Sequence, residues 1–278
     1  MGSEHDRIRD EWEAVAGGWR RWEPLFQSFT WPVALRMVAV AQIGAGQRVL
    51  DVGCGIGDPT LQVAVLVGPH GHVLGIDLVE EMLATGRERA AALGLAHVEF
   101  RAADIATLDV PPASFDAVLA RWSLIYIEDV SKALGRLRRA VHDGGRIAVT
   151  AWAPPEANPW IAIPMEELAR VLPVSPPDST TPGLFYLSAD GALADALRAA
   201  GFRNVAQERV QLSQFAREAA EFWAMLADMA GPLAPIVAGL TGPERRRLLD
   251  AVAERIERFR SGDVLRIPAQ AQLAWGEL

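Results

Sequence analysis

The chain of 278 residues is poor in cysteine, and it has no long apolar run. Cys54 is the only cysteine, so an intramolecular disulfide and a cysteine-based zinc site are both excluded. No stretch approaches the roughly 20 continuous apolar residues of a membrane-spanning helix. The first residues, MGSEHDRIRDEW, are charged and lack the apolar centre of a secretory signal peptide. These absences lead us to expect a cytoplasmic protein without a membrane span.

Positive charge is also in deficit. The chain has 27 lysine and arginine residues against 35 aspartate and glutamate residues, which gives a formal net charge of −8. A nucleic-acid backbone would be repelled, so we do not expect a nucleic-acid partner. The acidic residues are scattered without a divalent-ligand pattern, so we expect no metal site. The expected partner is a small molecule, and the oligomeric state, monomer or homodimer, stays open.

The most informative segment is RVLDVGCGIGD, residues 48–58. Residues that favour β-structure run into Asp51, and Gly53, Gly55 and Gly57 then alternate before a helical pattern begins. Because glycine has no Cβ and tolerates positive φ, such a loop lets bare backbone approach a ligand. The spacing D-x-G-x-G-x-G differs from the G-x-G-x-x-G fingerprint of dinucleotide-binding loops.

Asp58 stands where the following helix would open. A pyrophosphate requires free N–H groups and positive potential there, so a carboxylate makes the position a poor host for it. A ligand with an ammonium group, a sulfonium group and no phosphate suits the position, and S-adenosylmethionine is such a ligand. A nicotinamide-dependent oxidoreductase is therefore the less favoured interpretation.

Strand and helix patterns alternate regularly after residue 47. This alternation predicts an α/β fold with a Rossmann-like, seven-stranded and mostly parallel sheet that carries helices on both faces. The strands are expected at 48–53, 72–77, 97–101, 115–121, 146–152, near 204–211 and near 264–275. The helices are expected at 59–67, at 80–93, after Asp129 and from Ser188 to Gly201.

Three segments do not follow this alternation. Residues 1–42 are helical and tryptophan-rich, residues 153–187 are proline-rich and expected to lack regular structure, and residues 214–261 predict two amphipathic helices near 216–229 and 243–259. Ligands bind beyond the carboxyl ends of the strands in open α/β sheets, where the first two segments join the sheet and could form a lid. The predicted organisation is a helical lid at 1–42, a binding core at 43–152, a lid insertion at 153–187, a core continuation at 188–213, a helical insertion at 214–262 and a last core strand at 263–278.

Polar residues follow successive predicted strands. Asp77 ends the second strand, where an acidic side chain can accept both hydroxyls of a ribose. Ala103, Asp104 and Ile105 follow the third strand, and a carboxylate there could accept an adenine amino group. The fourth strand ends in residues 121–123, Arg-Trp-Ser.

Five segments together resemble a known family. They are VLDVGCGIGDPTL, GIDLVEEML, AADI, FDAVLARWSLIYIED and LRRAVHDGGRIAVTAW. They are similar to the successive motifs of class I S-adenosylmethionine-dependent methyltransferases, in particular the ubiquinone/menaquinone C-methyltransferase-like group and its natural-product O-methyltransferase relatives. The resemblance covers about residues 45–152 strongly and 188–211 weakly.

The resemblance implies S-adenosylmethionine as the cofactor and a role for each motif residue. The backbone around Asp51 and Gly53 would hold the methionine amino group, Asp77 the ribose, and Asp104 the exocyclic amine of adenine. The other cofactor-binding residues that it implies are Leu78 and Ile105 on either side of the adenine, Arg121 beneath the methionine moiety, and Gly55, Gly57, Met82 and Ala103 around the ligand.

Four of these residues also have a structural alternative. Asp51 could merely cap the glycine loop, and Asp77 and Asp104 could be ordinary turn residues. Arg121 could pair with Glu128 or Asp129 on the surface.

The predicted reaction is methyl transfer to an oxygen, carbon or nitrogen atom of a small apolar or aromatic acceptor. Some related O-methyltransferases carry a histidine pair where this chain has Ile125 and Tyr126, so Tyr126 is the candidate for a catalytic or positioning role. The residues expected to line the acceptor pocket are Trp19, Trp22, Trp31, Trp122, Tyr126 and Trp160. The alternative is a cofactor-binding protein of this fold that catalyses a non-methylating step.

Overall fold

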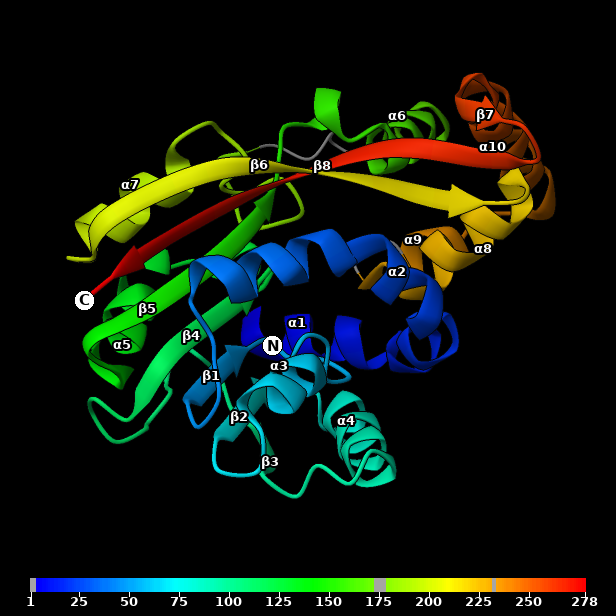
Figure 1. The fold of residues 1–278 in the computed structure, drawn as a ribbon. Helices are drawn as coiled ribbons and strands as arrows, with labels where there is room; N and C mark the ends of the chain where they lie inside the picture. The colour runs from blue at the N-terminus through cyan, green and yellow to red at the C-terminus, as the bar shows by residue number, and fades with distance from the viewer. Residues whose placement is uncertain (1–3, 173–178, 232–233) are drawn as a thin grey trace. The chain divides into compact units, whose positions relative to one another are not determined.

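The computed structural model describes residues 4–172, 179–231 and 234–278, and the chain divides into two compact units (Figure 1). The sheet unit comprises residues 31–153, 178–210 and 271–278, and the helical unit comprises 1–30, 154–177 and 211–270. The chain passes from one unit to the other five times, and three of these crossings fall within α2, β6 and β8. The predicted lids at 1–42 and 153–187 are therefore each divided between the two units, and their role as lids stays a prediction.

The sheet has the strand order β3-β2-β1-β4-β5-β8-β6, with the short β7 paired to β8 outside this path. Five neighbouring strands are parallel to one another, namely β3, β2, β1, β4 and β5, and β8 is antiparallel to β5. The predicted Rossmann-like, mostly parallel α/β fold is therefore confirmed, but the sheet has eight strands and not the predicted seven, because the short β7 pairs with β8. The strands are β1 (Arg48–Val52), β2 (His72–Asp77), β3 (Val98–Ala102), β4 (Phe115–Arg121), β5 (Val141–Trp152), β6 (Arg203–Ala216), β7 (Arg260–Ser261) and β8 (Val264–Glu277).

The order of the strands reverses between β1 and β4. From β1 the chain proceeds to β2 and β3 on one side, whereas β4 and β5 lie on the other side. In open α/β sheets the crevice outside the carboxyl ends of the strands at such a switch point is the usual ligand site. The register pairs Asp51 of β1 with Leu119 of β4, so the segments that follow these strands emerge side by side.

The helices of the sheet unit begin close to the predicted positions, with one clear exception. Asp129 caps its helix as predicted, because its side chain accepts a hydrogen bond from the Lys132 N–H at 2.8 Å. The helix predicted to begin at Ser188 begins at Ala192 instead, after Gly191 at φ +85°. The helical elements are α3 (Thr60–Val67), α4 (Glu80–Ala92), the short 3₁₀ helix η1 (Leu124–Tyr126), α5 (Val130–Ala140), α7 (Ala192–Ala199) and the second half of α2 (Ala16–Val40).

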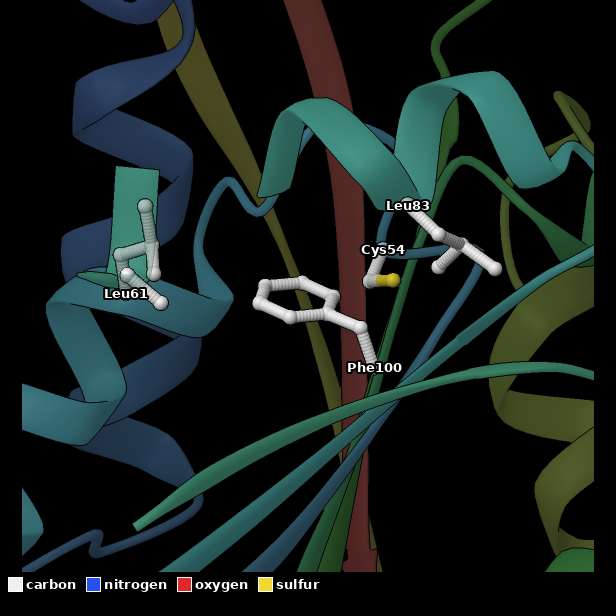
Figure 2. Close-up of a cluster of buried hydrophobic side chains, with 5 residues drawn as sticks. Cys54, Leu61, Leu83 and Phe100 are labelled. Carbon is white, nitrogen blue, oxygen red and sulfur yellow. The ribbon is translucent and has the colours of Figure 1, made fainter. Parts of the chain in front are cut away.

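A small apolar cluster fixes α4 against the sheet (Figure 2). Phe100 of β3 lies so close to α4 that a Cβ on Gly86 would come within 2.8 Å of its ring. Burial raises the pKa of the Cys54 thiol well above its usual range, so this thiol is a packing group and not a nucleophile. The cluster consists of Cys54, Leu61, Leu83, Ala90 and Phe100.

The helices α1 and α2 confirm a helical segment between Glu4 and Val40, whereas the prediction for 153–187 is corrected. The prolines do not prevent regular structure, because α6 runs over 13 residues. Pro159 stands in the first turn of α6, where a backbone N–H would have no intrahelical acceptor, so the N–H that proline lacks is not needed there. Residues 173–178 of this predicted insertion lie outside the described residues. The elements of the helical unit are α1 (Glu4–Glu13), the first half of α2, η2 (Pro155–Ala157), α6 (Pro159–Val171), α8 (Ala219–Met229), α9 (Ala234–Ala238), α10 (Gly242–Ile256) and η4 (Glu257–Phe259).

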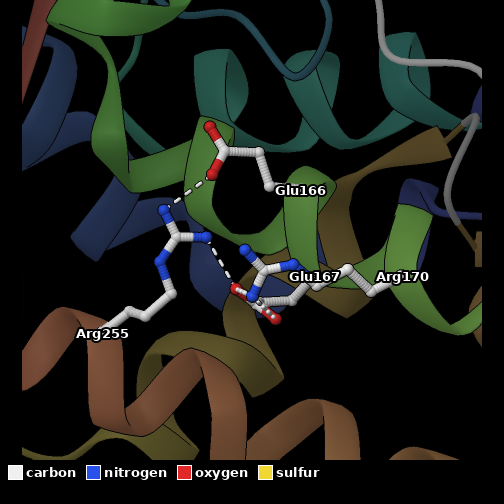
Figure 3. A network of polar contacts seen from close by, with 4 residues as sticks. All are labelled: Glu166, Glu167, Arg170 and Arg255. Atoms are coloured by element: carbon white, nitrogen blue, oxygen red, sulfur yellow. Dashed lines mark hydrogen bonds and ion pairs between the residues drawn. The ribbon is translucent and has the colours of Figure 1, made fainter.

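An ion-pair network joins α6 to α10 in the helical unit (Figure 3). The Arg255 guanidinium bonds Glu167 and Glu166, each at 2.6 Å, and Arg170 bonds Glu167 at 2.8 Å. The Glu167 side chain is only 4% exposed, so an unpaired charge there would be costly. Two guanidinium groups compensate it. None of the helices in the described part of the chain has the length and apolar character that crossing a membrane requires.

Candidate functional site

The loop after β1 packs directly on the segment after β4. Gly53 adopts φ +71°, and a Cβ built on it would lie 2.4 Å from the Cβ of Ser123. Real side chains do not approach so closely, and positive φ is itself unfavourable for other residues. The position therefore requires glycine, and the two loops meet at the switch point of the sheet.

Asp77 holds the glycine loop in shape. Its Oδ2 accepts a hydrogen bond from the Gly55 N–H at 2.8 Å, and its Oδ1 accepts one from the Val79 N–H at 3.0 Å. Arg89 of α4 adds a bond to the Ile56 carbonyl at 2.8 Å. Asp77 is therefore not a solvated turn residue. Its organising role was not foreseen from the sequence, because it depends on the contact between the ends of β1 and β2.

Asp51 is buried and only half satisfied. Its Oδ2 accepts a hydrogen bond from the Thr60 hydroxyl at 2.6 Å, whereas its Oδ1 is buried and has no partner among the described residues. Burial raises the pKa of Asp51 to about 6, although the Thr60 bond and the charge of Arg121 act in the opposite direction. The bare oxygen has the chemistry to accept a hydrogen bond from a ligand donor. Thr60 was missed from the sequence; the signal was a hydroxyl residue in the first turn of a largely apolar helix.

Arg121 does not pair on the surface. Its side chain is 6% exposed, and its Nη2 donates to the Asp58 carbonyl oxygen at 2.5 Å and pairs with Asp58 Oδ2 at 3.1 Å. The alternative of an Arg121 pair on the surface is wrong, because the side chain is buried against Asp58 of the glycine loop. Asp58 lies before α3 and balances this buried guanidinium.

The ends of β2 and β3 bring further predicted residues toward the glycine loop. The Ala103 N–H donates to the Asp77 carbonyl at 2.9 Å, and a Cβ on Gly55 would be 3.8 Å from the sulfur of Met82. Asp104 Oδ1 accepts a bond from the Ala106 N–H at 2.7 Å, which is the geometry of a turn.

Two of the residues implied around the adenine differ in exposure. Ile105 is buried and Leu78 is half-buried. The adenine contacts of Leu78, Asp104 and Ile105 stay predictions.

The segment after β4 holds Trp122 in a strained conformation. Trp122 adopts φ +53°, and its ring stacks on Trp152 with centroids 4.3 Å apart and planes 12° apart. Its indole N–H is buried without a partner among the described residues. Such strain in a bulky residue typically occurs at functional sites. Tyr126, four residues further on, is half-buried in η1.

The other tryptophans differ in exposure and contacts. Trp31, in the sheet unit, is 40% exposed. In the helical unit the indole N–H groups of Trp19, Trp22 and Trp160 have protein acceptors, and the Trp160 ring packs edge-to-face on Phe29 at 5.3 Å. The acceptors are the Met229 carbonyl for Trp19, Asp228 for Trp22 and Asn158 for Trp160. That these rings line an acceptor pocket stays a prediction.

Comparison with known proteins agrees with this geometry. A family model described as a methyltransferase domain matches residues 43–170. Nocamycin O-methyltransferase of Saccharothrix syringae is 36% identical over 203 residues, which are 69% of this chain and 72% of that protein. Demethylmenaquinone methyltransferase of Symbiobacterium thermophilum is 31% identical over 147 residues, 51% of this chain and 54% of that protein.

A solved structure shares the fold at lower sequence identity. The crystal structure of the cyclase SpnF superposes with a TM-score of 0.56 at 25% identity, over 88% of this chain and 80% of that chain. The fold and the loops at its switch point define a ligand-binding α/β enzyme. The matches identify it further: the chain belongs to the S-adenosylmethionine-dependent methyltransferases.

The residues present fit the cofactor of this family. Asp51 offers a buried acceptor oxygen to an ammonium group. In the glycine loop a ligand can approach the backbone closely, because no side chains stand in the way. No group of three or more His, Cys, Asp or Glu side chains suited to a metal ion occurs within the described ranges.

Cofactor affinity should depend on pH through Asp51. Burial raises the pKa of Asp51 to about 6, so in the free protein the buried carboxyl is protonated below that pH. As the pH rises through about 6, the carboxyl ionises and the stability that the neutral form gave to the fold is lost. The ionised form attracts a cation, so we expect the affinity for S-adenosylmethionine to rise from pH 5 to pH 7, by at most about tenfold per pH unit. Calorimetric titrations at several pH values measure this rise. The Asp51→Asn variant should bind weakly with a flat profile, and an unchanged profile in that variant would assign the dependence to another group.

Proposed function

We propose that the protein transfers a methyl group from S-adenosylmethionine to an oxygen, carbon or nitrogen atom of a small apolar or aromatic acceptor. The acceptor class is that of quinones, polyketides and terpenoids. The observation that carries the proposal is the 36% identity to nocamycin O-methyltransferase over 72% of that protein. The similarity to a methyltransferase named for demethylmenaquinone supports a flat acceptor.

The mechanism requires little chemistry from the side chains. The cofactor supplies a methyl group that is already activated by a positively charged sulfur. The chain has to bind it, align the acceptor atom in line with the bond that breaks, and exclude water. Such positioning can contribute about 7–11 kcal/mol to lowering the barrier. In this proposal Asp77 holds the ribose hydroxyls, and Asp51 Oδ1 accepts from the amino group.

Tyr126 is assigned to positioning and not to proton abstraction. If its hydroxyl only orients the acceptor, Tyr126→Phe should lower turnover by about tenfold or less, whereas loss of a general base typically costs about 10²–10⁴-fold. Single-turnover rates with a saturating acceptor measure the difference. A loss in the larger range would overturn a mechanism based on proximity alone.

The proposal is tested by incubating the protein with S-adenosylmethionine and a panel of quinones, aromatic polyketides and terpenoids. Mass spectrometry should detect one acceptor that gains a methyl group together with an equal amount of S-adenosylhomocysteine. Calorimetry against NADH tests the oxidoreductase interpretation, for which we expect no binding.

A second candidate function rests on the 25% identity to the cyclase SpnF. In that case the protein would bind the cofactor and rearrange its substrate, but the cofactor would not be consumed. A panel member that isomerises, with no S-adenosylhomocysteine formed, would favour this candidate over methyl transfer.

A further inference from the structure

A buried ion pair joins the end of β4 to the glycine loop just before α3. The side chains of Arg121 and Asp58 are 6% and 8% exposed, and they are joined by the 3.1 Å contact described above. One oxygen of Asp58 is also buried without a partner among the described residues. Burying two charges is expensive, so such a pair is weak evidence for a purely stabilising role.

The pair belongs to the same electrostatic cluster as Asp51. The charge of Arg121 lowers the pKa of Asp51, whereas the charges of Asp58 and Asp77 raise it. All four groups lie at the ends of β1, β2 and β4 or in the loop after β1. The cluster therefore has three carboxylates and one guanidinium, and its charge is negative when the carboxylates are ionised.

A guanidinium is a poor neighbour for a positively charged ligand. A guanidinium carries a fixed positive charge in proteins, and charges in a buried site are screened less than those in water. Asp58 neutralises it, so that Asp51 and Asp77 determine the sign of the local potential. Without Asp58, the cluster would lose one of its three negative charges and the guanidinium its ion-pair partner in the glycine loop.

The two forms of the cofactor differ in charge. In methyl transfer the bond between sulfur and the methyl carbon breaks, its electron pair stays on sulfur, and the sulfonium becomes a neutral thioether. S-adenosylhomocysteine thus differs from S-adenosylmethionine by one methyl group and one positive charge. A change in the local electrostatic potential therefore alters the binding of S-adenosylmethionine more than the binding of S-adenosylhomocysteine.

We propose that Asp58, acting through Arg121, sets the preference of the site for the positively charged cofactor over its neutral product. Asp58 is then a positioning and specificity-determining residue that favours product release. This inference rests on the proposed binding of S-adenosylmethionine, but it does not depend on the acceptor.

Calorimetric dissociation constants for both forms of the cofactor test the proposal. In Asp58→Asn, which keeps the shape of the side chain, we expect binding of S-adenosylmethionine to weaken on the order of tenfold relative to binding of S-adenosylhomocysteine. Arg121→Gln should change this ratio in the opposite direction. The double variant Asp58→Asn/Arg121→Gln should return to the parental ratio, because both charges are then gone.

The surface pair of Asp190 with Arg209 provides a matched control. Asp190→Asn removes the same charge from an exposed side chain and should leave the ratio unchanged. An equal loss for both ligands in Asp58→Asn would assign the pair a structural role and overturn the proposal. If Asp58→Asn does not fold, the shift in Arg121→Gln decides. Failure of the unaltered protein to bind either form would instead contradict the proposed function.

Discussion

Substitution of Asp77 by alanine is expected to weaken binding of S-adenosylmethionine by about ten- to hundredfold. The side chain organises the loop through the Gly55 N–H, and we assign it to the ribose hydroxyls as well. A hydrogen bond to a charged group contributes about 1.5–3 kcal/mol, and every 1.4 kcal/mol is about tenfold in affinity. Calorimetric titration of the variant with the cofactor measures the loss.

Two comparisons separate the ligand role of Asp77 from its loop role. Asp77→Asn keeps an acceptor oxygen for one N–H and should lose less affinity than the alanine variant. Asp109→Ala removes an exposed carboxylate and should bind the cofactor like the parent protein. Unchanged affinity in Asp77→Ala would remove Asp77 from the binding site.

Substitution of Gly53 by alanine should destabilise the protein and abolish measurable cofactor binding. The new Cβ would collide with Ser123 and would also have to adopt φ +71°. A left-handed conformation costs a non-glycine residue about 1–2 kcal/mol, and overpacking costs about 1–3 kcal/mol. Thermal unfolding and a cofactor titration measure the two effects.

Gly46 offers the matched control for this substitution. It has φ +81°, but a Cβ there would meet no atom within 4 Å. Gly46→Ala therefore incurs the conformational cost without the collision, and it should bind the cofactor normally. If both variants behaved alike, the contact between Gly53 and Ser123 would have no special importance.

Much of the sheet unit could be predicted because its signals are local. The alternation of apolar residues, the glycine spacing after Asp51 and the aspartate that ends β2 each depend on a few neighbouring positions. Features that depend on contacts between distant parts of the chain were predicted less accurately. β6 and β8 are longer than expected, since pairing with neighbouring strands extends β-structure beyond the apolar alternation. α6 forms despite its prolines, and α10 ends at Ile256, three residues before the predicted end.

By itself the sequence determined the fold class, the glycine loop and the family resemblance, because backbone conformation and hydrophobic period are encoded position by position. Only the tertiary structure decided which charges meet. Asp58 and Arg121 are 63 residues apart in the chain, and Asp51 meets Thr60 across the loop. These partners depend on which strands are neighbours and in what register. The burial that leaves one oxygen of Asp51 bare, and so suited to a ligand, exists only once β1, β4 and α3 have packed together.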